Sequence, residues 1–260
     1  MNLQLLVAAV EEDVIKLSNK MNIGSDAIIV NQGDSYEFVQ YKHRGGRNIV
    51  AYTFAERGVG LSRNTALMRA DADIVLFSDC DIVYEDDYRE KVLSEFEKNP
   101  KADMILFNVD VEPDRKTYQI DGYGRVRWYN CGRYPTYSMA VKLDKLRKHN
   151  ICFSLLFGGG AKYSNGEDSL FIRDCIKKGL KVYKAPVLIG AETPGESTWF
   201  RGYTEKFFVD RGVLYHYLYG RLAPIMARRF IHKNKETMCQ FITTRMALKF
   251  MKQGMKEAKK

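Results

Sequence analysis

Apolar runs and helix-like spacing alternate along the first 111 residues of the chain. Short apolar runs bounded by polar residues predict strands, and amphipathic segments between them predict helices. The predicted strands are Leu3–Val10, Ala27–Val30, Phe38–Tyr41, Ile49–Phe54, Ile74–Phe77 and Met104–Val111. The predicted helices are Glu11–Met21, Ser62–Ala70 with Ser62 as its N-cap, and Asp86–Lys98. This alternation predicts an α/β sandwich around a largely parallel sheet.

The pattern changes after this region. Residues 113–166 are less regular, and strand-like pieces such as Tyr137–Val141 mix there with loops. Glu167–Lys178 predicts a helix, and Leu180–Tyr183 a strand that follows it. From Tyr203 onward the spacing is helical apart from Pro224. We therefore expect an irregular middle region and a helical C-terminal region.

Two aspartates, Asp79 and Asp81, stand directly after the apolar run Ile74–Phe77. In open α/β sheets, ligands bind beyond the carboxyl ends of such strands. Two carboxylates there suit a hard divalent cation that also holds a diphosphate. The alternative is that they only end the strand and open a turn. A second Asp-x-Asp at 71–73 precedes the strand, so position favours the pair at 79 and 81.

Two other segments could carry chemistry. A glycine loop at residues 57–61 leads into a helix with Arg63 and Asn64 in its first turn. Such helix starts bind phosphate, although a capped surface helix with a solvated Arg63 is the ordinary alternative. Glu167 and Asp168 follow Gly166 at the start of another helix. Acidic residues there usually cap the helix, but one facing a nucleotide could accept a proton from a hydroxyl.

In this order and spacing the three segments resemble the family 2 glycosyltransferases of the GT-A fold, and are similar to bacterial members that build capsular and other surface polysaccharides. The resemblance covers roughly residues 3–183, and more weakly 196–199. It implies an α/β/α sandwich with a mostly parallel mixed sheet and a helical C-terminal tail. It also implies a nucleotide-sugar-binding half at 1–112, an acceptor-binding half at 113–202 and a basic helical extension at 203–260.

The resemblance implies inverting transfer of a sugar from a nucleotide sugar, usually a UDP-sugar, with Mn²⁺ or Mg²⁺. Asp81 would be the main metal ligand, and Asp79 would contact the ribose or the metal. Arg63 and Asn64 would help to hold the nucleotide. Asp168 would be the general base, with Glu167 orienting the acceptor beside it.

The chain departs from the family pattern at several places. Asn31 stands where an acidic turn is usual, although its amide can still bind the edge of a base. A His often completes the metal site in this family, but none occurs between Asp168 and Trp199, so Glu192, His216 or water would take its place. Trp199 could stack on an acceptor sugar, and a structural role for it is an equal alternative.

The net charge of +9 comes from the C-terminal end. Residues 221–260 hold 11 Lys and Arg but 2 Asp and Glu, whereas the first 220 residues are balanced. The neutral body argues against a nucleic-acid partner. The basic, amphipathic tail predicts contact with an anionic membrane surface; packing on the body or on a second subunit of a homodimer is the alternative.

The remaining composition fits a cytoplasmic protein, peripheral at the inner face of the cytoplasmic membrane. The chain has no apolar run long enough for a membrane span, no basic leader, and five cysteines without a framework spacing. The acceptor would be a saccharide or a lipid-linked saccharide. Two other hypotheses stay open: a phosphatase of the haloacid dehalogenase type with Asp79 as nucleophile, and a non-enzymatic module that binds anions or polysaccharide.

Overall fold

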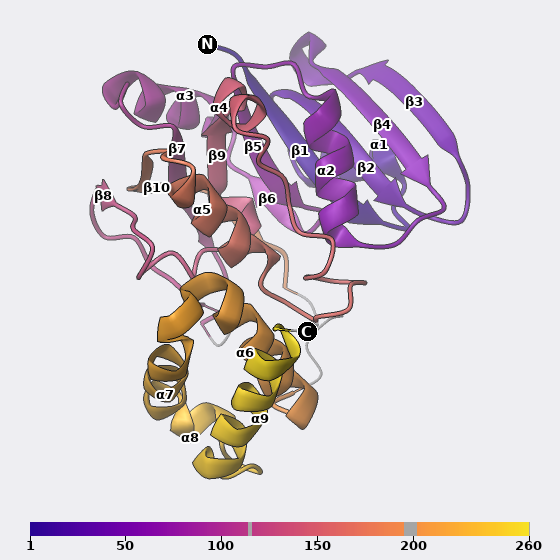
Figure 1. Cartoon of the computed structure of the whole chain (residues 1–260). Helices are drawn as coiled ribbons and strands as arrows, with labels where there is room; N and C mark the ends of the chain where they lie inside the picture. The colour runs from indigo at the N-terminus through magenta and orange to yellow at the C-terminus, as the bar shows by residue number, and fades with distance from the viewer. Residues whose placement is uncertain (114–115, 195–201, 260) are drawn as a thin grey trace.

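A ten-stranded mixed sheet forms the centre of the computed structural model, which describes residues 1–113, 116–194 and 202–259 (Figure 1). The strands are β1 (Leu3–Val10), β2 (Asp26–Gln32), β3 (Glu37–Lys42), β4 (Asn48–Phe54), β5 (Ile74–Asp79), β6 (Ile82–Tyr84), β7 (Met104–Asp110), β8 (Gly124–Arg125), β9 (Met139–Lys142) and β10 (Val182–Glu192). Their order is β3-β4-β2-β1-β5-β9-β7-β10-β6, with β8 paired to β10.

Four of the nine strand pairs among the described residues are parallel, and these four hold more than half of the paired residues. Strands β4, β2, β1 and β5 form one parallel group, and β7 and β10 form a second. Strand β9 lies between the groups and is antiparallel to both β5 and β7. The antiparallel strands β3, β6 and β8 lie at the periphery of the sheet. The predicted α/β sandwich with a mostly parallel sheet is confirmed.

Helices cover both faces of the sheet. The helices are α1 (Val14–Lys20), α2 (Val59–Arg69), α3 (Tyr88–Lys98), α4 (Leu143–Lys148), α5 (Glu167–Lys177), α6 (Glu205–Tyr219), α7 (Ala223–Lys233), α8 (Lys235–Met238) and α9 (Thr244–Glu257). Strand β1 shows why both faces need cover. Leu5 and Val7 pack in a core with α1 and α3, whereas Leu6 packs in a second core with α2, α4 and α5. A strand buried on both faces is almost wholly apolar, and in β1 the buried Gln4 is the single polar residue.

Helix α2 begins three residues before the position expected from the sequence. Its N-cap is Gly58, so the prediction that Ser62 caps this helix is wrong. Gly58 has a φ of 131°, a conformation that favours glycine. The Ser62 hydroxyl lies inside the helix and donates to the Val30 carbonyl at 3.1 Å. The glycine loop therefore enters the helix directly.

Helices α6 to α9 form a helical unit with its own apolar core, below the sheet in Figure 1. Two glycines allow α6 and α9 to pack with their backbones in contact. A Cβ on Gly212 would lie 2.1 Å from the Met251 carbonyl oxygen, and one on Gly254 would lie 2.0 Å from that of Val209. None of the helices in the described ranges is both long and apolar enough to cross a membrane.

Candidate active site

The acid pair lies where β5 ends in the middle of the sheet. Asp79 is the last residue of β5 and lies opposite Ala8 of β1, and Asp81 follows two residues later. The Asp81 carbonyl accepts a hydrogen bond of 2.7 Å from the Thr193 amide. The adjacent residue, Glu192, ends β10 and lies opposite Ile82. Strand register thus brings Glu192 next to the acid pair.

Tyr137 is a residue of this region that the sequence did not single out. It lies in the 3₁₀ turn Thr136–Ser138 just before β9. Burial raises the pKa of Tyr137, and the nearby charges of Glu192, Asp79 and Asp81 raise it further. The three carboxylates are therefore close enough for their charges to act on one largely buried tyrosine. Its position in the irregular middle region left no local signal that it would lie here.

The carboxylates offer oxygen ligands, which suit Mg²⁺ or Mn²⁺. Within the described residues, no three His, Cys, Asp or Glu side chains are grouped as a ready metal site. A pair of carboxylates whose remaining ligands come from a diphosphate and water still fits such a cation. Of the two suggested additional ligands, Glu192 lies beside the pair. His216 lies on α6, where its ring contacts Tyr217.

Arg63 connects the acid pair to the start of helix α5. Its guanidinium donates to Asp79 Oδ1 at 2.7 Å and to Glu167 Oε1 at 2.9 Å, and only 5% of its side chain is exposed. Burial alone would lower the pKa of Arg63, but Asp79 and Glu167 outweigh this effect and raise it. The guanidinium also lies 5.5 Å from the centre of the Phe153 ring. Arg63 is therefore a buried cation, not a solvated one.

Glu167 and Asp168 form the first turn of α5. Gly166 precedes them with a φ of 115°, and its amide donates to Glu167 Oε2 at 3.1 Å. Burial raises the pKa of Asp168 to about 6, and the charge of Glu167 adds to this effect, which Arg63 partly opposes. A carboxyl with this pKa is a good proton acceptor near neutral pH. Glu167 is thus a carboxylate held in place by Arg63 and the Gly166 amide, and Asp168 beside it is a more basic carboxylate.

Two amides proposed to bind the donor already have partners in the protein. Asn64 donates to the Phe153 carbonyl at 2.9 Å and accepts from the Phe153 amide at 2.7 Å. Asn31 makes the same kind of pair with the backbone of Glu12, at 3.0 and 3.1 Å. Both side chains fix loops that border the site. Trp199 lies outside the described residues.

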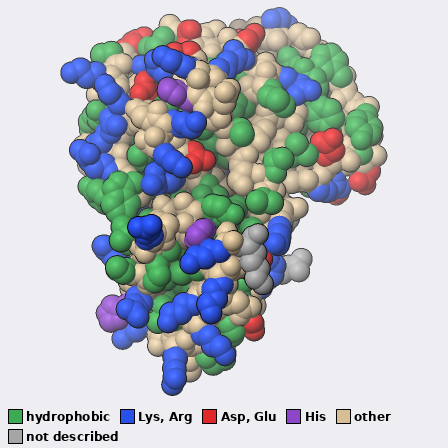
Figure 2. All heavy atoms as spheres, viewed as in Figure 1, with side chains coloured by type: hydrophobic (Ala, Val, Ile, Leu, Met, Phe, Trp, Pro, Cys, Tyr) green, Lys and Arg blue, Asp and Glu red, His purple; other side chains and the backbone are tan. Residues whose placement is uncertain are grey.

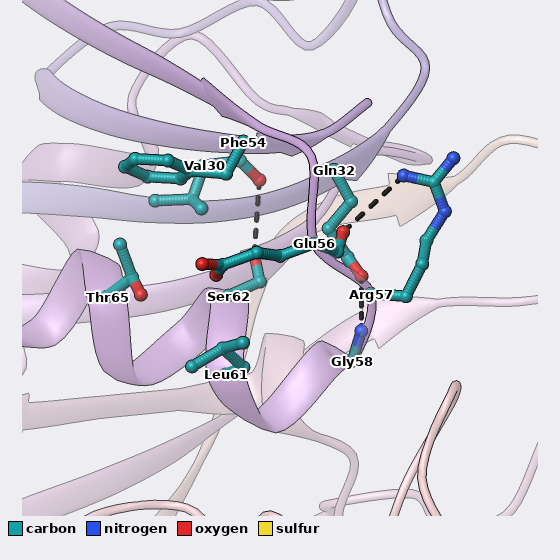
Figure 3. Close-up of a pocket in the computed structure, with 9 residues that line it drawn as sticks. All are labelled: Val30, Gln32, Phe54, Glu56, Arg57, Gly58, Leu61, Ser62 and Thr65. Atoms are coloured by element: carbon teal, nitrogen blue, oxygen red, sulfur yellow. Dashed lines mark hydrogen bonds between the residues drawn. The ribbon is translucent and has the colours of Figure 1, made fainter. Parts of the chain in front are cut away.

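The start of α2 is also occupied. The Gly58 amide donates to Gln32 Oε1 at 2.6 Å, and the Val59 amide donates to the Gly159 carbonyl at 2.9 Å. These two groups are therefore not available to a phosphate. A small pocket lies beside this loop, between α2 and strands β2 and β4, and Arg57 extends away from it (Figure 3). Its lining residues are Val30, Gln32, Phe54, Glu56, Arg57, Gly58, Leu61, Ser62 and Thr65. The pocket does not include the acid pair.

Solved structures share this fold. Residues 1–349 of S. aureus TarS in complex with UDP-GlcNAc superpose with a TM-score of 0.64 at 14% identity, over 93% of this chain and 74% of TarS 1–349. The mannosyltransferase PcManGT from Pyrobaculum calidifontis, in complex with GDP-Man and Mn²⁺, gives 0.56 at 14% identity, over 99% of this chain and 75% of PcManGT. These likenesses confirm the predicted GT-A fold.

The sequence comparisons agree with the fold. A search among curated proteins finds no match. The family model for glycosyl transferase family 2 matches residues 24–157, which is just over half of the chain. This segment includes the glycine loop, Arg63 and the acid pair. The chain therefore belongs to glycosyl transferase family 2.

Proposed function

We propose that this glycosyltransferase catalyses metal-dependent, inverting transfer of a hexosyl group from a UDP-sugar to a hydroxyl of a saccharide or lipid-linked saccharide, in the synthesis of a bacterial surface polysaccharide such as a capsule. The observation that carries the proposal is the pair of ion pairs made by Arg63. They join Asp79 of the acid pair to Glu167 of the acceptor helix, in a chain of this family. Family membership favours a transferase over the phosphatase and binding-module hypotheses.

The reaction needs a base on the acceptor side. Asp168 takes the proton from the acceptor hydroxyl, and Glu167 orients the acceptor beside it. The acceptor oxygen then forms a bond to C1 of the sugar as the bond from C1 to the diphosphate oxygen breaks. Attack occurs on the face opposite the leaving group, so the anomeric configuration inverts. The raised pKa of Asp168 supports this role, because the carboxyl can hold the proton it receives.

The donor side uses the acid pair. Asp81 and Asp79 would hold Mn²⁺ or Mg²⁺ with the diphosphate, and Asp79 could instead contact the ribose. Such an ion offsets negative charge on the departing diphosphate. Glu192 is the better placed of the two further ligands. Arg63, Asn64 and Asn31 would border the nucleotide, and Trp199 would stack on the acceptor sugar.

The choice of nucleotide is part of the test, because the two similar structures hold UDP-GlcNAc and GDP-Man respectively. Calorimetric titration of UDP and of GDP, each with Mn²⁺ and with EDTA, into wild type and Asp81→Ala measures it directly. We expect UDP binding that needs Mn²⁺ and is lost in Asp81→Ala. Binding of GDP alone would change the donor, and no nucleotide binding under any condition would overturn the proposal.

A lipid-linked acceptor would place the enzyme at the inner face of the cytoplasmic membrane, as a cytoplasmic, peripheral protein. Transfer assays with extracted lipid-linked saccharides, compared with soluble saccharides, would test this choice of acceptor. Faster transfer to soluble acceptors would contradict it.

A further inference from the structure

The surface of the helical unit carries cations without acidic partners. Eleven Lys and Arg lie between Arg221 and Lys260, and all but Lys260 are among the described residues. None of these ten forms an ion pair with another described residue. Of the two acids in this stretch, Glu257 pairs with Lys162 of the body. Figure 2 shows Lys and Arg side chains spread over the near face of this unit.

Helix α9 arranges part of this charge in a stripe. Arg245, Lys249, Lys252 and Lys256 are exposed and follow one another at spacings of four, three and four residues. Residues at such spacings share one side of a helix. The other side holds the buried residues Ala247, Met251, Gly254 and Met255. The stripe therefore faces away from the core of the helical unit.

Large apolar side chains are exposed among these cations. Phe241, in the turn between α8 and α9, is 99% exposed, and Ile225 on α7 is 62% exposed. Leu222 and Met246 are also exposed. Contact between an exposed aromatic ring and water is unfavourable, and a partner that covers the ring removes this contact. A purely ionic partner, such as a polyanion, has no apolar surface that could cover this ring.

We propose that this basic surface, made by the exposed cations of Arg221–Lys259 together with the exposed Phe241, docks on an anionic lipid bilayer. The cations meet the headgroups while Phe241 enters the interface. The inference deepens the proposed function and rests on it for its purpose, because a lipid-linked acceptor is presented at such a surface. The binding itself needs neither donor nor acceptor.

One set of contacts joins this surface to the acceptor side of the site. Glu257, at the end of α9, accepts a hydrogen bond of 3.0 Å from the Tyr163 hydroxyl and pairs with Lys162 at 3.1 Å. Tyr163 lies four residues before Glu167. Helix α9 is thus held against the segment that leads to the proposed base, so docking through α9 would bring the acceptor helix to the bilayer.

Sedimentation of the full chain with sucrose-loaded vesicles tests the proposal. We choose vesicles of phosphatidylcholine with about 30% phosphatidylglycerol and compare them with vesicles of phosphatidylcholine alone. We expect binding only to the anionic vesicles, weakened by salt. The triple variant Arg245→Gln, Lys249→Gln, Lys252→Gln should bind about 100-fold more weakly, at about fivefold for each cation. Phe241→Ser should bind about tenfold more weakly.

Matched variants on the body separate the surface from net charge. The triple Lys101→Gln, Lys177→Gln, Lys178→Gln makes the same change in charge at exposed positions of the sheet domain, and Phe38→Ser replaces an aromatic that is 59% exposed there. Both should bind like wild type. Failure of wild type to bind anionic vesicles, or an equal loss in the body triple, would overturn the proposal.

Donor hydrolysis in the absence of vesicles is measured on every variant. Unchanged hydrolysis in the α9 triple shows that the site and fold are intact, so its loss of vesicle binding is specific. Vesicle binding by a wild type that binds no nucleotide, with or without Mn²⁺, would instead refute the proposed function and leave the docking surface standing.

Discussion

Replacing Arg63 with methionine tests the link between the acid pair and helix α5. The change keeps most of the side-chain length but removes both ion pairs. Breaking a buried pair costs about 3–5 kcal/mol, because the remaining charge stays buried without a partner. The Asp79 side chain is 32% exposed and can be hydrated, whereas that of Glu167 is 14% exposed. We therefore expect the free energy of unfolding to fall by about 3 kcal/mol, which lowers Tm by roughly 6–12 °C in a chain of this size.

Thermal and urea unfolding followed by circular dichroism measure this loss. Arg69→Met is the matched control on the same helix. Its guanidinium lies over the Tyr52 and Phe54 rings, at 4.7 and 5.7 Å, and its loss should cost less than about 1 kcal/mol.

A second variant tests the cause. In Arg63→Met with Glu167→Gln the buried carboxylate is neutral, so about half of the lost stability should return. A loss below about 1 kcal/mol in the single variant, or no recovery in the double one, would show that these pairs contribute no more than surface pairs.

Three further changes have distinct outcomes. Asp168→Asn should abolish transfer, and in wild type kcat/KM should fall about tenfold per pH unit below the Asp168 pKa of about 6. Because this carboxyl binds its proton more tightly in the folded state, the stability of wild type should decrease as pH rises from about 4 to 6. Asp168→Asn should therefore be about 1–3 kcal/mol more stable than wild type at pH 7. If the free energy of unfolding depended on pH in the same way in wild type and in Asp168→Asn, the raised pKa of Asp168 would be refuted. Gly212→Ala should destabilise the helical unit by about 3 kcal/mol or more in urea, since its Cβ meets a carbonyl at 2.1 Å. Gly122→Ala, with open space around it, should change stability by less than about 1 kcal/mol. Asn64→Ala should cost about 2 kcal/mol in the same assay through its two hydrogen bonds to Phe153, and a neutral effect would contradict that role.

The sequence predicted those elements whose environment is uniform along their length. Strands β1 and β5 are buried on both faces, so their apolar runs are continuous and easy to recognise. The predicted strand Leu180–Tyr183 covers only the first two residues of β10, which continues through Pro186 to Glu192. The structure accommodates that proline where the pairing with β7 shifts between Lys184 and Leu188. A local pattern does not reveal such an irregularity.

The candidate site was only partly predictable for a related reason. The position of Asp79 and Asp81 follows from one strand, so the local pattern was sufficient. The partners of Arg63 lie 16 and 104 residues away, and only the folded sheet brings them together. The same holds for Tyr137, which comes near the carboxylates because it precedes β9, the strand that lies between β5 and β7. The start of α2 was misplaced because Ser62 has the residue type of an N-cap while the glycine loop makes the actual turn.

The antiparallel strand β9 has a consequence for how the protein forms during synthesis. Strand β5 ends at Asp79 and β7 at Asp110, but β9, which fills the space between them, begins only at Met139. At typical translation rates the apolar edge of β5 therefore waits roughly 3–12 s for its neighbour. An unpaired central edge is a site for wrong pairing with other chains. The nascent chain is thus vulnerable to aggregation while residues 80–142 are being made, before the two parallel groups of strands can join.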